Sequence, residues 1–146
     1  MRSASLTPRD KNNLMRRNSF IKDEMNLLPR FKDLSWKTYQ DDSLERKIVE
    51  RWIENLCNAA IDIAKIMLSS ESKKIPDTYK ETLHMLALLD GFEEKIALEL
   101  ANFSKLRNII SHEYLDIRFK QIREFVDSAE RLYPYLVDFV DRFTKK

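Results

Sequence analysis

Four residues in the last third of the chain combine a cation, an amide, an imidazole and a phenol: Arg107, Asn108, His112 and Tyr114. We expect them at the far end of one long helix, where residues four apart share a face and Asn108 and His112 would be neighbours. Arg107 and Tyr114 would share a stripe, whereas Arg107 and His112 would point about 140° apart. An imidazole and a guanidinium within one short stretch are residue types suited to acid–base chemistry on a phosphate ester.

The residues alone leave two interpretations of this stretch open. In the structural one, the helix macrodipole favours His112 at a helix C-terminus, Arg107 pairs with a carboxylate, and Tyr114 is half-buried. In the functional one, His112 is an acid–base catalyst, Arg107 stabilises charge on a phosphate, and Asn108 orients His112 or the substrate. Clusters of polar residues occur at functional sites and also in structural ion-pair networks, so the cluster alone does not decide between the two interpretations.

The pattern Arg107-Asn108-x-x-x-His112-x-Tyr114 resembles the motif of HEPN-domain ribonucleases, and with Leu106 before it the pattern is similar to that of the HepT toxin branch. Short motifs give false matches, so the rest of the chain matters. Other stretches are similar to the family's second helix, to the loop and helix start after it, and to the segment before the motif: Asp42 through Glu50-Arg51 with residues 60–64, Ile75-Pro76 with Tyr79, and Gly91-Phe92. The resemblance covers roughly residues 7–143.

This resemblance implies the toxin of a toxin–antitoxin pair, an endoribonuclease that needs no metal and no other cofactor. The 2′-hydroxyl of RNA would be the nucleophile. His112 would be the acid–base catalyst, Arg107 would stabilise the phosphoryl charge, and Asn108 would position His112. The products would carry 2′,3′-cyclic phosphate ends, and a homodimer would bring two copies of the motif together across its two-fold interface.

The resemblance also implies an antitoxin partner, a small nucleotidyltransferase of the MNT type. It would use ATP to attach AMP to Tyr114, and the added phosphate would repel RNA and occupy Arg107. Two alternatives remain. The chain would then be either a non-catalytic helical subunit that binds nucleotide or the nucleotidyltransferase, or a family member without activity. Intact Arg107 and His112 argue against the second alternative without proving turnover.

Composition favours a single helical domain. The chain has 146 residues with one glycine and four prolines, and 34% of the residues are charged. Such a composition suits long helices with solvated outer faces. We expect a flexible tail over residues 1–6 and one HEPN-like domain over residues 7–146. Cys57 has no partner for an internal disulfide and should be a core residue. No membrane span or signal sequence is recognisable, which indicates a cytoplasmic protein.

Charge is unevenly distributed along the chain, although the net charge is only +2. Residues 1–40 carry a net charge of +5, residues 41–104 carry −5, and residues 105–146 carry +2. A group of basic residues includes and flanks the motif: Lys105, Arg107, Arg118, Lys120 and Arg123. These residues would attract an RNA backbone, but a mixed solvated surface explains them equally well.

Apolar spacing predicts an all-α, antiparallel, up-and-down bundle of four or five helices. The first helix runs from Thr7-Pro8 to about residue 28, where Pro29 ends or kinks it. Ser35 caps a single turn. The second helix, capped at residue 42 or 43, extends to residues 69–70 and is about 40 Å long.

The second half of the chain is expected to hold three helices. One opens at Pro76-Asp77 and ends at Asp90-Gly91, with Gly91 as a left-handed C-cap. The next begins near Glu93 and carries the motif at its far end. After a short turn at residues 115–117, the last helix spans about 118–143 and kinks near Pro134.

Three other polar residues are further site candidates. His84 has no Cys or His at ligand spacing, so we expect a surface or packing role and no metal site. Asp62 would be a buried partner for a cation on another helix, or else a support for the motif. Arg51 would form an ion pair on the helix surface, or else line a dimer groove.

Overall fold

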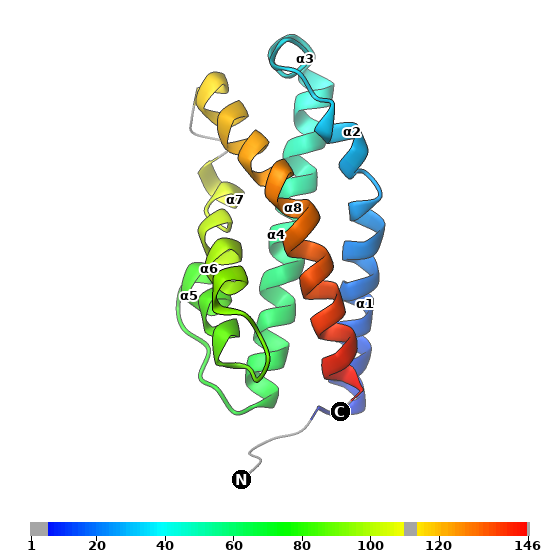
Figure 1. Ribbon diagram of the computed structural model, residues 1–146, viewed down its shortest axis with the longest axis vertical. Helices are drawn as coiled ribbons and strands as arrows, with labels where there is room; N and C mark the ends of the chain where they lie inside the picture. The colour runs from blue at the N-terminus through cyan, green and yellow to red at the C-terminus, as the bar shows by residue number, and fades with distance from the viewer. Residues whose placement is uncertain (1–5, 110–113, 146) are drawn as a thin grey trace.

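All the secondary structure in the computed structural model, which describes residues 6–109 and 114–145, is helical, so the all-α prediction is confirmed (Figure 1). The elements, in order, are α1 (Pro8–Met25), α2 (Leu28–Lys32), α3 (Trp36–Asp41), α4 (Ser43–Ser70), α5 (Tyr79–His84), the 3-10 helix η1 (Met85–Leu88), α6 (Glu94–Phe103), α7 (Leu106–Ile109) and α8 (Leu115–Thr144).

The long helices run up and down in alternation, as predicted. In Figure 1, α1 rises, α4 descends, α6 rises and α8 descends, so the start of α1 and the end of α8 lie at the same end. Helix α1 packs on both α4 and α8, whereas α5 and α6 pack on each other at the other side of α4. The arrangement places α7 and the beginning of α8 near one another, away from the chain ends (Figure 1).

Helix α4 is the central element of the bundle. Its 28 residues span about 42 Å, and Asp42 caps it by accepting hydrogen bonds from the backbone N–H groups of Leu44 and Glu45. Trp52 is buried in its middle, with ring centroids 4.7 Å from Phe31 and 5.7 Å from Phe125. This aromatic contact joins α4 to α2 and α8, and the predicted extent of the helix is confirmed.

The first part of the chain follows the predicted caps. Thr7 accepts a hydrogen bond from Asp10 N–H, and Pro8 opens α1. The helix ends at Met25, and Pro29 stands in the first turn of the short α2, where its missing N–H costs nothing. Ser35 caps α3 by accepting from Thr38 N–H. The predicted tail at residues 1–6 lies outside the described residues except for Leu6, which packs partly against the core.

The helix predicted from Pro76-Asp77 to Asp90-Gly91 is shorter than expected. Thr78 caps α5 by accepting from Glu81 N–H, so the helix begins at Tyr79. From Met85 onward the chain forms a 3-10 turn instead. Gly91 has the predicted left-handed conformation, with φ of +84°, in a turn closed by the Phe92 N–H to Leu89 carbonyl hydrogen bond of 3.1 Å.

The prediction of one long helix carrying the motif is wrong. Helix α6 ends at Phe103, and a turn at Ser104 and Lys105 separates it from α7. The Ser104 hydroxyl donates to the Ala101 carbonyl at 2.6 Å, as serine side chains do when they compete with the helical backbone pattern. Arg107 and Asn108 therefore lie on a separate four-residue helix.

The last helix begins earlier than predicted. Residues 115–117 form the first turn of α8 and not a separate connection. The helix continues through Pro134 to Thr144 without interruption, and the kink near Pro134 stays a prediction. Helix α8 buries a continuous apolar face that includes Phe125, Leu132 and Phe139.

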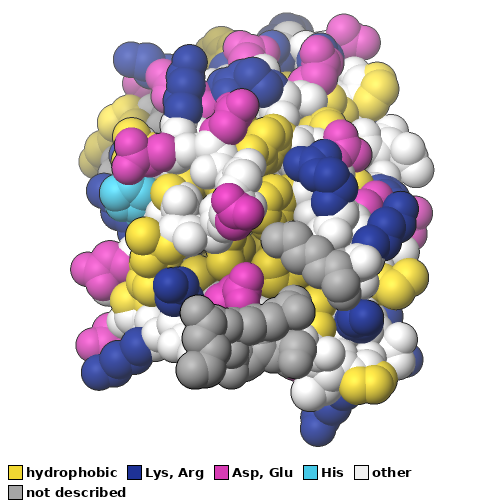
Figure 2. All heavy atoms as spheres, turned by 60° about the horizontal axis from the view of Figure 1, so that its bottom comes forward, with side chains coloured by type: hydrophobic (Ala, Val, Ile, Leu, Met, Phe, Trp, Pro, Cys, Tyr) yellow, Lys and Arg dark blue, Asp and Glu magenta, His cyan; other side chains and the backbone are white. Residues whose placement is uncertain are grey.

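The end of the bundle that holds the chain ends has a mixed surface. Figure 2 shows this end with hydrophobic side chains over its centre and charged side chains of both signs around them. Among the described residues, no helix has the length and apolar character needed to span a membrane.

Candidate functional site

Arg107 is held by two residues from other helices. Its Nε donates a hydrogen bond to Oδ1 of Asn58 on α4, and its guanidinium carbon lies 4.7 Å from the ring centroid of Tyr79 on α5. The side chain is half-buried. Within residues 6–109 and 114–145 it forms no ion pair, so the expected carboxylate partner is not found there. Arg107 is thus a positioned cation without a neutralising neighbour in this part of the chain.

The aromatic ring of Tyr79 contacts two cations. Besides Arg107, Nζ of Lys65 on α4 lies 5.2 Å from the centroid of the same ring. Tyr79 is the first residue of α5, so the Thr78 cap fixes the backbone that carries the ring. A cation over an aromatic face is attracted by the ring quadrupole, which holds both long side chains near one point.

The remaining motif residues are only partly described. The backbone of Asn108 belongs to α7. The Asn108 side chain and the whole of His112 lie outside the described residues. Their assigned roles as positioning partner and acid–base catalyst therefore stay predictions.

Tyr114 departs from its predicted place on a helical stripe with Arg107. It has extended backbone, with φ of −65° and ψ of 154°, and forms the N-cap position of α8. Its carbonyl accepts the first helical hydrogen bond from Arg118 N–H at 2.9 Å. The side chain is 81% exposed, so the expectation of a half-buried tyrosine is also wrong.

Next to Tyr114, a polar network fixes the first turn of α8. Arg118 Nη2 lies 2.6 Å from Oε2 of Glu50 on α4, and Arg118 Nε donates to the Tyr39 hydroxyl of α3 at 3.1 Å. Tyr39 in turn donates to Glu50 Oε2. The Arg118 and Glu50 side chains are only 15% and 17% exposed. The network therefore joins α3, α4 and α8 beside the candidate site.

The network shifts two pKa values. Burial, together with the hydrogen bond to Glu50, raises the pKa of Tyr39 to about 12. Burial acts to lower the pKa of Arg118, but the hydrogen bond to Tyr39 and the charge of Glu50 outweigh it and raise the pKa above its usual value. Arg118 remains a cation and Tyr39 a neutral donor, which makes the cluster a structural anchor.

The basic group around the motif divides into two sets. Arg118 donates hydrogen bonds to Glu50 and Tyr39. Arg123 donates to the Phe31 and Lys32 carbonyls at 3.0 Å. Lys105 and Lys120 are exposed. Of the predicted cations, Lys105 and Lys120 are therefore exposed, and Arg107 is half-buried with a neutral hydrogen-bond partner.

The other sequence candidates have structural roles. Asp62 pairs with Arg17 of α1 at 3.4 Å, but its side chain is 48% exposed, so it is a cation partner without being buried. Arg51 forms the expected surface ion pair, with Glu54 at 3.2 Å. His84 is exposed, as predicted. Burial raises the pKa of the Cys57 thiol to about 12, which fits an inert core residue.

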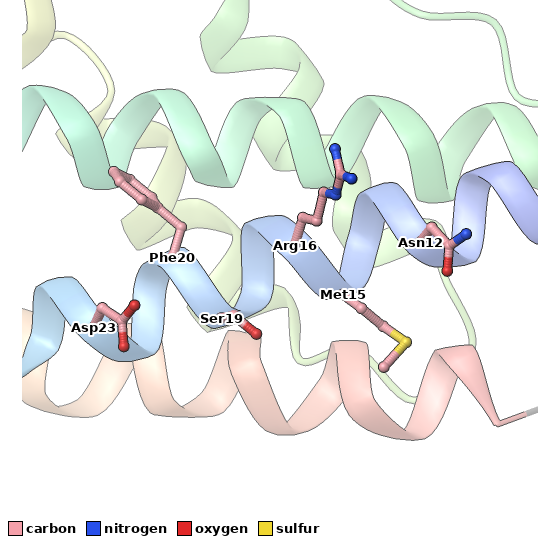
Figure 3. Close-up of a pocket in the computed structure, with 6 residues that line it drawn as sticks. All are labelled: Asn12, Met15, Arg16, Ser19, Phe20 and Asp23. Carbon is pink, nitrogen blue, oxygen red and sulfur yellow. The ribbon is translucent and has the colours of Figure 1, made fainter.

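The described part of the chain groups no metal ligands, and one depression in it lies on α1. Over the described ranges, no three His, Cys, Asp or Glu side chains are grouped as metal ligands. A depression of about 630 Å³ lies elsewhere, along the outer face of α1. Figure 3 shows that its six lining residues all come from that one helix. None of these six residues belongs to the motif, so this depression is separate from the site around Arg107.

Sequence reasoning missed Asn58, which holds Arg107, and Lys65, which shares the Tyr79 ring with it. Asn58 and Lys65 are seven positions apart, about two turns, and lie on one stripe of α4. Polar residues on the outer stripe of an otherwise apolar helix were a usable signal for them. No spacing rule connects that stripe to Tyr79 or to Arg107, because both contacts depend on tertiary packing.

Comparison with known proteins agrees with the motif. Residues 21–143 match the family described as "Ribonuclease HepT-like". A protein of Aphanizomenon flos-aquae (strain 2012/KM1/D3) named "tRNA nuclease HepT" is 28% identical over 116 residues, which are 80% of this chain and 79% of that protein. The family match spans most of the chain and includes all four motif residues. The chain therefore belongs to the HepT-like ribonuclease family.

Proposed function

We propose that this protein is the toxin of a toxin–antitoxin pair and cleaves RNA without a metal ion. One observation carries the proposal in this chain. A half-buried arginine, held by Asn58 and Tyr79 and without an acidic partner in the described residues, is part of the family motif that also contains His112. A cation held this way is ready to stabilise negative charge on a phosphate.

The proposed reaction uses the substrate's own nucleophile. The 2′-oxygen of a ribose attacks the adjacent phosphorus while the bond to the 5′-oxygen breaks. The products are a 2′,3′-cyclic phosphate and a 5′-hydroxyl. His112 takes the 2′-hydroxyl proton or donates one to the leaving 5′-oxygen. Arg107 stabilises the charge on the phosphoryl oxygens, and Asn108 orients His112.

Transfer RNA is the first substrate to test. The relative from Aphanizomenon flos-aquae is named a tRNA nuclease, and this chain matches 79% of its length. The exposed Lys105 and Lys120 near the motif would attract the phosphate backbone of a folded RNA.

The proposed active form is a homodimer in which two copies of the motif face a shared groove. One chain carries two histidines, His84 and His112, and His84 lies on α5, outside the motif. A two-fold interface would supply a second His112 to the groove. Sedimentation at several concentrations, combined with cleavage rates at the same concentrations, tests this point. Activity should fall as the dimer dissociates.

Control is proposed to act through Tyr114. Its side chain is 81% exposed at the start of α8, so its hydroxyl is accessible to an MNT-type nucleotidyltransferase. Attachment of AMP forms a bond from the tyrosine oxygen to the α-phosphorus of ATP and releases pyrophosphate. The new anionic group would compete with RNA phosphates for Arg107.

A substrate-side experiment tests the cleavage chemistry. A tRNA is cleaved, the cut position is mapped, and the same tRNA is prepared with a single 2′-O-methyl group at that position. The proposal expects the modified site to resist cleavage and the unmodified product to carry a cyclic phosphate. Cleavage of the methylated linkage, or a product with a 5′-phosphate, would contradict the mechanism. Tight binding of tRNA without any cleavage would indicate a binding subunit instead.

A further inference from the structure

Two cations share one aromatic ring beside the candidate site. The Arg107 guanidinium carbon and Lys65 Nζ lie 4.7 and 5.2 Å from the centroid of the Tyr79 ring, so they are at most about 10 Å apart. They come from α7 and α4, and the ring comes from α5. Three separate elements therefore converge to bring two like charges together.

Neither cation beside Tyr79 has a carboxylate partner among the described residues. Arg30, Arg118 and Arg131 each face a carboxylate at 2.5 to 2.6 Å. Lys65 and Arg107, in contrast, form no ion pair with any carboxylate that the structure describes. The polar partner of Arg107 is the neutral Asn58 amide. Like charges at this distance repel one another, and a bound anion would relieve that repulsion.

We propose that Lys65, Tyr79 and Arg107 form a subsite for two neighbouring phosphates of one RNA strand. Arg107 takes the phosphate that is cleaved, and Lys65 takes the next one. The strand therefore crosses the Tyr79 ring from Arg107 on α7 to Lys65 on α4. This inference rests on the proposed function for the identity of the anion, but the subsite is a binding feature and can be tested without cleavage.

The residue types fit these separate tasks. The planar guanidinium of Arg107 can bind two phosphoryl oxygens at once, whereas Lys65 is a compact point charge on a flexible stem. Tyr79 is 39% exposed and holds both cations through its ring, so its aromatic face matters more than its hydroxyl. Loss of the ring would remove the cation–π contact of both side chains, although both positive charges would remain.

Salt dependence of RNA binding tests the subsite. The probe is a fluorescent single-stranded 2′-O-methyl RNA of mixed sequence, which binds but lacks the 2′-hydroxyl nucleophile. For single strands, the slope of log K against log salt changes by about 0.7 for each phosphate that the protein neutralises. We expect the slope of Lys65→Gln to be shallower by that amount. Lys47→Gln is the matched control, because Lys47 is exposed on the same stripe of α4 eighteen residues away, about 27 Å.

Tyr79 provides a second variant pair with unchanged charge. Tyr79→Phe keeps the ring and should bind the probe as the native chain does. Tyr79→Leu should weaken binding several-fold at low salt. Circular dichroism spectra and melting temperatures close to the native ones would show that both variants are folded.

The outcomes separate this inference from the proposed function. A reduced slope in Lys65→Gln, with Lys47→Gln unchanged, supports the subsite even if the chain cleaves no RNA. Equal slopes for the native chain and Lys65→Gln overturn the subsite, even if the native chain is an active ribonuclease. Failure of the native chain to bind the probe at low salt also overturns it.

Discussion

Arg107 and Asn58 are 49 positions apart in the chain, yet Arg107 Nε donates a hydrogen bond directly to Asn58 Oδ1. The guanidinium is thereby oriented from α4 and not by its own four-residue helix. Because α4 packs against α1, α5, α7 and α8, the central helix of the bundle sets the direction of the proposed catalytic cation.

The first prediction concerns this positioning role. Asn58→Ala should lower kcat about tenfold, because Arg107 keeps its charge but loses its orientation. Asn58→Asp should keep Arg107 in place but offset its charge, so kcat should fall at least as far as in Asn58→Ala. Steady-state cleavage of tRNA measures kcat for both variants.

Asn55 supplies the matched control for Asn58. It lies on the same helix and donates to Glu24 Oε1 at 3.1 Å, on the side of α4 that faces α1. Asn55→Ala should leave cleavage within about twofold of the native rate, because this bond is not part of the Arg107 support. Equal losses in the Asn55 and Asn58 variants would mean that helix stability, and not Arg107 positioning, explains the effect.

The second prediction concerns the anchor beside α8. Glu50→Gln should lower the free energy of unfolding by about 2 kcal/mol, since it leaves the mostly buried Arg118 without its counter-charge. Glu54→Gln breaks the exposed pair with Arg51 and should cost less than about 0.5 kcal/mol. Urea unfolding followed by circular dichroism measures both values. A Glu50 variant as stable as the Glu54 variant would show that the network contributes nothing to stability.

The third prediction is a pH dependence. The pKa of Tyr39 is raised to about 12 in the folded protein from an ordinary value of 10.0. The folded state thus retains the proton more strongly than the unfolded chain. The stabilisation is fully present below about pH 10 and is lost as the pH rises from about 10 to about 12. Unfolding titrations of the native chain and Tyr39→Phe should therefore converge across that window. A constant difference between them from about pH 8 to about pH 12 would contradict the assignment.

The sequence predicted the long helices well because their signals are local. The Asp42 cap and the apolar stripe of α4 lie within the helix that they specify. The break after Phe103 was missed because the apolar stripe continues across it through Leu106, while the Ser104 side chain bonds back to the Ala101 carbonyl. Arg107 therefore lies on the separate α7 and Tyr114 at the N-cap of α8, so their predicted place on one helical stripe is wrong.

The sequence predicted which motif residues belong to the candidate site, but not which residues of other helices hold them in place. The motif alone indicated Arg107 and Tyr114. Asn58, which holds Arg107, and Glu50, which pairs with Arg118 in the first turn after Tyr114, are distant from the motif in sequence. Their contacts exist only after the helices pack. Arg118 shows the reverse error, since it was grouped with the RNA-binding cations and instead forms a structural ion pair with Glu50.

The fourth prediction concerns modification. Tyr114→Phe should remain an active ribonuclease and should resist silencing by an MNT-type partner with ATP, because it lacks the acceptor oxygen. Intact-mass spectrometry after incubation with the partner detects AMP on the native chain. Tyr135→Phe is a control, since that hydroxyl accepts from Glu93 N–H at 2.9 Å on another part of the bundle. AMP on the Tyr114→Phe variant, together with silencing, would show that another residue is the target.

The most direct measurement of the central claim is tRNA cleavage in excess EDTA by the native chain, His112→Ala and Arg107→Ala. Mass spectrometry must first show that Tyr114 carries no AMP, and circular dichroism that all three proteins are folded. The account predicts cleavage by the native chain alone, with a loss of at least about a hundredfold in each variant. Full activity in either variant, or no cleavage by the folded and unmodified native dimer, would contradict it.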